Sequence, residues 1–295
     1  MRHKHGTGGE IINNLHELIF HINGTPNGSM QYFKQMDYPL KSNLSLDFKP
    51  FLSFMHQCNY RMLNKVTFIG DLFNYKYYLQ LQNWILANDY LSNLVILDQD
   101  FEKNISKTDW INSDNINITL VVRRQTEFFY KIKHYVNLPF KIAFSFPVTT
   151  RNQFDLISQL VKEVNLTNYS IIPIFNGKNH KFFEENIYLN SDDFKEISLS
   201  KREVFANMAL NTYSFGKLTI MPDGRLFSNV NDPSLGSIYD PIYNLLYKEM
   251  TKRKTWLRIR DMKPCCDCVY QWLCPSPGNY ELVTGISNLC HILPG

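Results

Sequence analysis

Six cysteines occur in this 295-residue sequence, and five of them lie between Cys265 and Cys290. Cys265 and Cys268 form a C-x2-C pair, Cys274 follows after five further residues, and Cys290 comes later. A C-x2-C pair places two thiolates on one tight turn, and two more cysteines complete a set of four. Four thiolates suit an iron–sulfur cluster or a structural zinc ion. We therefore predict one metal centre with Cys265, Cys268, Cys274 and Cys290 as its ligands.

The identity of the metal stays open at this point. Zinc would also stabilise a small, loop-rich segment, but zinc ribbons usually carry two C-x2-C pairs and this segment has one, which favours a cluster. Unligated thiols are the other alternative, because free Cys packs as a small hydrophobic residue. Cys266 is expected to point away from a site that Cys265 and Cys268 share, and Cys58 is expected in the core because it follows apolar residues of a predicted helix.

Composition and charge exclude several classes of partner. The sequence is 44% hydrophobic and carries a formal charge of +4 with dispersed Lys and Arg, so a clustered nucleic-acid footprint is not expected. The basic run 252–254, followed by Arg258 and Arg260, is interpreted as a solvated helix end. No stretch approaches ~20 apolar residues, so we expect no membrane span. The start lacks an apolar signal core, which predicts a cytoplasmic protein whose clustered cysteines bind metal.

The elements that must position the cysteines follow two patterns. Up to about residue 211, short apolar runs alternate with helical patterns, which is typical of βαβ units with a parallel sheet. We predict strands at 18–22, 65–70, 94–97, 116–122, 141–146 and 170–174, and helices at 48–58, 77–87, 127–136, 153–164 and 200–210. Six such units suit either a partial α/β barrel or a doubly wound sheet.

The pattern changes near residue 212. Residues 217–227 predict two short strands joined by a Pro-Asp-Gly turn, in which Gly224 supplies a positive φ, and 243–252 predict a helix. From residue 264 the chain is rich in Cys, Pro and Gly, and little regular structure is expected. We therefore predict a flexible N-terminus at 1–12, an α/β domain at 13–211 and a metal-binding domain at 212–295.

The cysteine spacing resembles that of the SPASM domain, a C-terminal extension of many radical SAM peptide-modifying enzymes. The resemblance implies that Cys265, Cys268, Cys274 and Cys290 hold one auxiliary 4Fe–4S cluster. In that family a second auxiliary cluster takes further cysteines. The corresponding positions here carry no cysteine: Gly278, Ser214 or Phe215, and Ser228 or Asn229. One cluster site is thus complete and the other is entirely absent.

The front half resembles the partial (β/α)6 barrel of radical SAM enzymes, without its catalytic motif. The family's C-x3-C-x2-C loop follows the first strand, where residues 23–33 contain no cysteine. The Gly-Gly-Glu-Pro motif that holds SAM follows the second strand, where residues 69–73 read Ile-Gly-Asp-Leu-Phe. Three thiolates are needed to hold the cluster that cleaves SAM. The resemblance therefore implies a degenerate barrel that does not use SAM.

From about residue 13 the chain resembles the pseudo-radical SAM proteins of Bacteroidales systems that mature ribosomally made peptides. The marker segments are 215–224, 270–281 and 288–291. Such proteins occur beside a genuine radical SAM maturase and a small double-glycine precursor peptide. The resemblance implies a non-catalytic protein that binds the maturase or the peptide, with one cluster that is structural or relays electrons.

A different class of enzyme is the remaining alternative. Asp71, Arg123 and Arg124 follow predicted strands and would lie at the barrel rim, where α/β active sites form. Asp71 is expected to cap the next helix, and the Arg pair is expected to be solvated. No convincing nucleophile and base occur together in the sequence.

Overall fold

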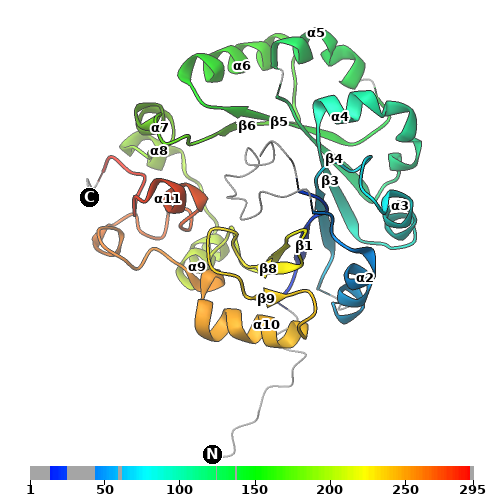
Figure 1. The fold of residues 1–295 in the computed structure, drawn as a ribbon. Coiled ribbons are helices and arrows are strands. Elements are labelled where there is room, and N and C mark those ends of the chain that lie inside the picture. Colours follow the sequence, from blue (N-terminus) through cyan, green and yellow to red (C-terminus); the bar gives the residue numbers. More distant parts are fainter. Residues whose placement is uncertain (1–13, 25–43, 59–61, 124, 137, 293–295) are drawn as a thin grey trace, which may run out of the picture.

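A long, curved sheet forms the centre of the molecule. The computed structural model describes residues 14–24, 44–58, 62–123, 125–136 and 138–292, so the N-terminus predicted at 1–12 lies outside it. Within the described residues the strand order is β6-β5-β4-β3-β2-β1-β7-β8-β9 (Figure 1). The strands are β1 (Glu17–His21), β2 (Lys65–Ile69), β3 (Leu91–Leu97), β4 (Ile116–Val121), β5 (Ile142–Val148), β6 (Tyr169–Pro173), β7 (Lys217–Ile220), β8 (Arg225–Phe227) and β9 (Gly236–Ser237).

The strand order distinguishes between the two predicted architectures. Strands β1 to β6 are parallel, and each lies beside the next one in sequence. A doubly wound sheet reverses its order at a switch point, whereas a barrel adds each strand beside the last. The order found is that of a partial barrel. On the other side of β1, β7 pairs in parallel, and β8 and β9 continue the sheet in antiparallel fashion.

Helices cover the outer side of the curved sheet (Figure 1). Asp47 accepts a hydrogen bond from the backbone N–H of Lys49 at the start of α2, and Thr150 accepts one from Gln153 at the start of α6. None of the helices in the described ranges is long and apolar enough to cross a membrane. The helices are α2 (Phe48–Gln57), α3 (Tyr78–Leu86), α4 (Asp98–Lys103), α5 (Gln125–Val136), α6 (Arg151–Glu163), α7 (His180–Asn186), α8 (Ser191–Glu196), α9 (Lys201–Ala209), α10 (Ile242–Lys248) and α11 (Asn279–Thr284).

Strands β1, β2 and β5 are buried on both faces, which explains their continuous apolar runs. Side chains alternate along a strand, so neighbours in β1 face opposite sides. Leu18 and Phe20 belong to the main core, where the Phe20 ring meets Phe51 edge-on at 5.0 Å. Ile19 belongs to a separate cluster on the other face, with one residue from each of the next three strands: Ile69, Val95 and Val121. Each such side chain contributes about 1.5–3 kcal/mol on burial.

The predicted strands and helices of the front half are all found, with shifted ends. Strand β3 begins at Leu91 rather than residue 94, because its residues 91–95 pair with the whole of β2. Helix α4, directly after β3, was not predicted. The helix predicted at 243–252 is found as α10, which ends at Lys248, and a π-helix over Glu249–Arg253 that continues directly from it.

The sheet runs across the boundary predicted near residue 212. Four residue pairs join β1 to β7, from Glu17–Lys217 to Phe20–Ile220. Trp256, fully buried, donates its indole N–H to the carbonyl oxygen of Lys217 at 3.0 Å. The segments before and after residue 212 therefore share one sheet and one core. The division into two domains stays a prediction.

Helices α7 and α8 lie beyond the β6 end of the sheet, beside the C-terminal segment (Figure 1). Phe183 of α7 meets Tyr280 of α11 edge-on at 5.4 Å, and the Tyr280 hydroxyl donates to the carbonyl of Pro173 at the end of β6. Leu189, between α7 and α8, forms a parallel bridge with Cys290. The cysteine segment thus packs near the β6 end of the sheet, which is the end farthest from β1.

Candidate metal centre

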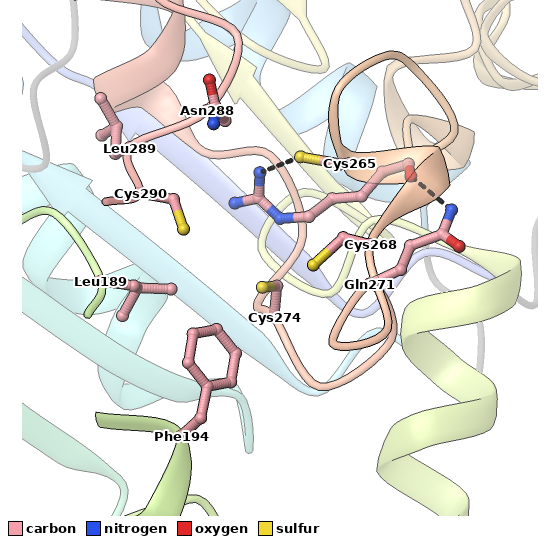
Figure 2. A pocket seen from close by; sticks show the side chains of 10 residues that line it. Leu189, Phe194, Cys265, Cys268, Gln271, Cys274, Asn288, Leu289 and Cys290 are labelled. Carbon is pink, nitrogen blue, oxygen red and sulfur yellow. Dashed lines mark hydrogen bonds between the residues drawn. The ribbon is translucent and has the colours of Figure 1, made fainter. Parts of the chain in front are cut away.

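The four predicted ligands line one pocket. Cys265, Cys268, Cys274 and Cys290 all contribute to its wall, and Figure 2 shows their sulfur atoms turned toward a shared space. All four are partly buried, and none forms a disulfide. The remaining wall combines three apolar side chains with one cation and two amides: Leu189, Phe194, Leu289, Arg260, Gln271 and Asn288. The sequence prediction that these cysteines come together in space agrees with this geometry.

Short turns place the first three cysteines. Cys265–Asp267 form a 3-10 turn, and the backbone N–H of Cys268 donates to the carbonyl of Cys265 at 3.1 Å. The N–H of Cys274 donates to the carbonyl of Tyr270 at 3.1 Å. The Tyr270 ring stacks on Phe194 of α8 at 4.6 Å, which anchors the loop between the second and third cysteines.

Cys290 is positioned by the segment between α7 and α8. The backbone N–H of Leu189 donates to the carbonyl of Leu289, and the N–H of His291 donates to the carbonyl of Leu189, both at 2.9 Å. These two hydrogen bonds hold the backbone on either side of Cys290, as in a pair of parallel strands. The fourth candidate ligand therefore depends on the barrel side of the molecule as well as on its own segment.

Two asparagines near the end of α9 donate hydrogen bonds to the backbone of the cysteine loop and of the residues that flank it. Asn207 donates its side-chain amide to the carbonyl of Trp272 at 3.1 Å. Asn211, almost fully buried, donates to the carbonyl of Arg258 at 3.0 Å and to that of Pro277 at 2.9 Å. Buried amides that satisfy several backbone groups at once are costly to replace. The loop is thus held by polar contacts that need no metal.

Arg260 is the charged pocket residue that the sequence analysis did not single out. The run 252–254 is exposed as predicted, but Arg258 and Arg260 are not a solvated helix end. Arg258 pairs with Asp232 at 2.8 Å, and Arg260, 8% exposed, pairs with Glu281 at 2.7 Å. Arg260 also lines the cysteine pocket. The available signal was its position five residues before the first of a set of predicted thiolates, where a cation balances charge.

The electrostatics of the pocket couple the four thiols. Burial raises the pKa of the Cys274 thiol to about 11; the Arg260 guanidinium acts in the opposite direction, and the thiols of Cys290, Cys265 and Cys268 raise the pKa further. A metal must therefore displace a proton from Cys274, as is general for thiolate ligands. The mutual repulsion of four thiolates would be removed by a cation or a cationic cluster core.

The donor set fits an iron–sulfur cluster. Thiolates in apolar surroundings with nearby hydrogen-bond donors are the usual environment of such clusters. Among the described residues, no group of three or more His, Cys, Asp or Glu is placed so that it could hold a metal ion. Four thiolates are the number that a 4Fe–4S cluster takes, one for each iron atom.

The other cysteines and His291 lie apart from this pocket wall. Cys58 is fully buried in the main core, as predicted. Cys266 is partly buried and does not line the pocket, which agrees with its predicted orientation. The exposed His291 has its Nε2 2.8 Å from the carbonyl oxygen of Glu184, and its ring lies 5.4 Å from Tyr188. His291 is therefore engaged with α7 and the residues after it.

At the carboxyl ends of β1 and β2, the residues bind each other. Asn23 donates its side-chain amide to the carbonyl of Asp71 at 2.8 Å and accepts from the Asp71 N–H at 2.9 Å. A Cβ at Gly70 would lie 2.4 Å from the Asn23 side-chain oxygen, so this contact requires glycine there. The expectation that Asp71 caps the next helix is wrong. Its carboxylate accepts hydrogen bonds from the backbone N–H and the side chain of Asn74, in the turn before α3.

The rest of the predicted rim is only partly described. Arg123 is exposed, and its backbone N–H donates to Asp98 at 3.4 Å. Arg124 and residues 25–33 of the segment after the first strand lie outside the described residues. No nucleophile and base are seen together at the described strand ends of β1 and β2.

Polar contacts fill the positions at which the resemblance places a second cluster. Ser228 donates to the carboxylate of Glu249 at 2.7 Å, and the N–H of Trp256 donates to the same carboxylate at 2.7 Å. Burial raises the pKa of Glu249, although these hydrogen bonds oppose the rise. Asn229 donates to Asn279 at 2.6 Å. Hydrogen-bonded side chains thus take the place of thiolates there.

The strand order and the outer helices define an α/β barrel-like protein. Among solved structures, the fold is similar to that of Streptococcus suis SuiB bound to S-adenosylmethionine, a radical SAM enzyme, with a TM-score of 0.57. The match covers 89% of this chain and 72% of the SuiB chain at 11% identity, so the likeness concerns the fold alone. No family model and no curated protein matches the sequence. The chain thus has a radical SAM-like fold.

Proposed function

We propose that this protein is a non-catalytic member of a radical SAM peptide-maturation system that binds one auxiliary 4Fe–4S cluster. The observation that carries the proposal is that Cys265, Cys268, Cys274 and Cys290 line one pocket, while the sequence contains no cysteine before Cys58. The ligands of an auxiliary cluster are present, and those of a catalytic cluster after β1 are absent.

The chemistry of the pocket supports iron and sulfide over other ligands. The four thiols would supply one ligand for each iron of a cubane cluster, Arg260 would supply a counter-charge, and Phe194 and Leu189 form apolar parts of the wall. A bound cluster of this type supplies a one-electron redox couple. The protein's own part is to hold the four sulfur atoms in a preformed, partly dry pocket. Zinc in the same site is the alternative that the test below must separate.

The absence of a catalytic cluster follows from ligand number. Reductive cleavage of SAM in this fold needs a cluster held by three thiolates with one open iron, and the segment from residue 22 to residue 57 offers none. Cys58, the first cysteine, is fully buried in the main core behind α2. The barrel would therefore serve to bind rather than to start radical chemistry.

The proposed partners are a radical SAM maturase and its precursor peptide, in the cytoplasm. The resemblance of segments 215–224 and 270–281 to pseudo-radical SAM proteins supports this assignment. The cluster would either stabilise the C-terminal segment or pass electrons to the maturase. Neither role requires this chain to bind SAM.

The decisive experiment is anaerobic purification followed by quantification of iron, sulfide and zinc. We expect a brown protein with about one 4Fe–4S cluster per chain and little zinc. Incubation with SAM and a strong reductant is expected to give no 5′-deoxyadenosine. A colourless protein with stoichiometric zinc would replace the cluster by zinc, and cysteine-dependent SAM cleavage would refute the non-catalytic role.

A further inference from the structure

Arg260 is the one charged side chain among the described residues that line the cysteine pocket. It lies five residues before Cys265 and is 8% exposed, which is unusual for arginine unless it is paired. Arginine keeps its charge under all physiological conditions. A fixed positive charge therefore sits in the wall of a pocket that is otherwise made of thiols, amides and apolar groups.

The guanidinium connects three parts of the cysteine segment. Its Nη1 lies 3.9 Å from the sulfur of Cys265, its Nε donates to the carbonyl of Pro275 at 2.6 Å, and its Nη2 donates to Glu281 at 2.7 Å. Pro275 directly follows Cys274, and Glu281 lies in α11, before Cys290. The planar guanidinium of arginine can donate to these three partners at once, whereas the single ammonium group of lysine cannot.

The backbone of Arg260 takes part in the same arrangement. Gln271, which also lines the pocket, donates its side-chain amide to the carbonyl of Arg260 at 2.6 Å. Glu281 accepts from Arg260 through one oxygen and from the N–H of Gly278 through the other, at 2.9 Å. Both carboxylate oxygens are thus engaged away from the thiols. Glu281 is not among the described residues of the pocket wall.

The position of this charge bears on the electron affinity of a bound cluster. A 4Fe–4S core with four thiolates is negatively charged, and one-electron reduction adds a further negative charge. A buried cation and an N–H group directed at a ligand sulfur stabilise the reduced state more than the oxidised state, which raises the reduction potential. Because the interior screens charges weakly, the effect on a buried site exceeds that at the surface.

We propose that Arg260 is the positioning and charge-balancing residue of the four-cysteine centre, which holds Cys265 and Cys274 in place and raises the reduction potential of the cluster. This inference rests on the proposed iron–sulfur centre. It assigns a specific role to a side chain that is not itself a ligand.

The test compares Arg260→Gln, Arg260→Lys and the control Arg258→Gln with the wild-type protein. Arg258 lies two residues away and pairs with Asp232, but it does not line the pocket. Each protein is purified anaerobically, its iron and sulfide are quantified, and its midpoint potential is determined by EPR during titration with dithionite and redox mediators. This readout reports the charge beside the cluster rather than the stability of the fold.

We expect the highest midpoint potential in the wild type, a lower one in Arg260→Lys and the most negative one in Arg260→Gln. The midpoint potential of Arg258→Gln should equal that of the wild type. Loss of iron from Arg260→Gln but not from Arg258→Gln would support the positioning role. Equal potentials in wild type and a fully loaded Arg260→Gln, or equal loss of iron from Arg258→Gln, would overturn the inference while leaving the cluster itself intact. A wild-type protein without iron would overturn the proposed cluster and this inference together.

Discussion

The four pocket cysteines differ from Cys266 in what they face, although all five belong to one short part of the chain. Cys274 is coupled to the other three by their mutual repulsion, whereas Cys266 does not line the pocket. A cysteine can thus lie next to a ligand in sequence without sharing its role. This distinction can be tested one side chain at a time.

Replacing Cys274 by Ser should remove most of the bound iron, because a serine hydroxyl is a poor ligand for iron in such clusters. Cys266→Ser is the matched control and should retain the wild-type iron content. Iron and sulfide assays on anaerobically purified protein measure both. Equal iron in the two variants would mean that Cys274 is not a ligand.

His21 gives the fold a dependence on pH. Burial lowers the pKa of His21 from 6.5 to about 3, so the unfolded chain binds a proton below pH 6.5 that the folded chain rejects. Stability should therefore fall as the pH drops from about 6.5 toward 3, by up to ~1.4 kcal/mol per pH unit. His21→Gln should flatten this slope in urea unfolding between pH 6.5 and 5. An unchanged slope would show that His21 is protonated in the folded state.

The spacing of the cysteines predicted the candidate ligands, because a metal site needs only a few side chains of one kind near each other. The same reasoning missed Arg260, since its role depends on burial against Glu281 and Pro275. Its neighbours at 252–254 are exposed. Composition alone does not separate a cation in a pocket wall from one in solvent.

At the scale of elements, α9 acts as a support for the cysteine loop. The side-chain oxygen of Asn211, just after this helix, accepts from the N–H groups of Tyr213 and Ser214, and its amide donates to two carbonyls of the C-terminal segment. A single side chain thereby joins the end of α9 to residues on both sides of the first three cysteines.

Asn211→Ala should lower the free energy of unfolding by about 2–4 kcal/mol, because it removes a buried amide and leaves partly buried backbone carbonyls without its hydrogen bonds. Lys201→Ala, on the exposed start of the same helix, should change it by less than about 0.5 kcal/mol. Denaturant unfolding of both variants gives the comparison. A loss in the Lys201 variant as large as in the Asn211 variant would contradict the assigned role of Asn211.

Periodicity identified the regular elements because buried parallel strands and amphipathic helices leave strong apolar patterns. It did not distinguish the π-helix at Glu249–Arg253 from the α-helix before it. There the buried carboxylate of Glu249 accepts from Ser228 and Trp256. The helix thus ends in contacts to residues distant in sequence, which local propensity does not report.

At the scale of the whole molecule, the strand that starts the barrel also joins it to the C-terminal part. Strand β1 lies between β2 and β7 and bonds to both. The carboxylate of Glu17, at its start, pairs with Lys65 of β2 at 3.0 Å and lies 3.9 Å from Lys217 of β7. The two predicted domains are therefore joined by β1, which pairs with one strand of each, and they share one core.

A variant that ends at residue 211 should not fold into a stable unit. Without β7, the backbone of β1 becomes an exposed sheet edge, and the buried Trp256 and the partly buried Phe215 no longer cover it. Circular dichroism with thermal melting and size-exclusion chromatography should show aggregation or a broad, non-cooperative transition. A monomer with a sharp transition would establish that residues 13–211 form an independent domain.

The bridge between Leu189 and Cys290 has one further consequence. Because a loaded centre would restrain Cys290, it would also restrain the residues that hydrogen-bond to either side of it. Hydrogen–deuterium exchange at the amide of Leu189 should then slow when iron is present, although Leu189 contributes no ligand. Metal bound to the four cysteines would thus also hold the segment between α7 and α8 more firmly against the residues around Cys290.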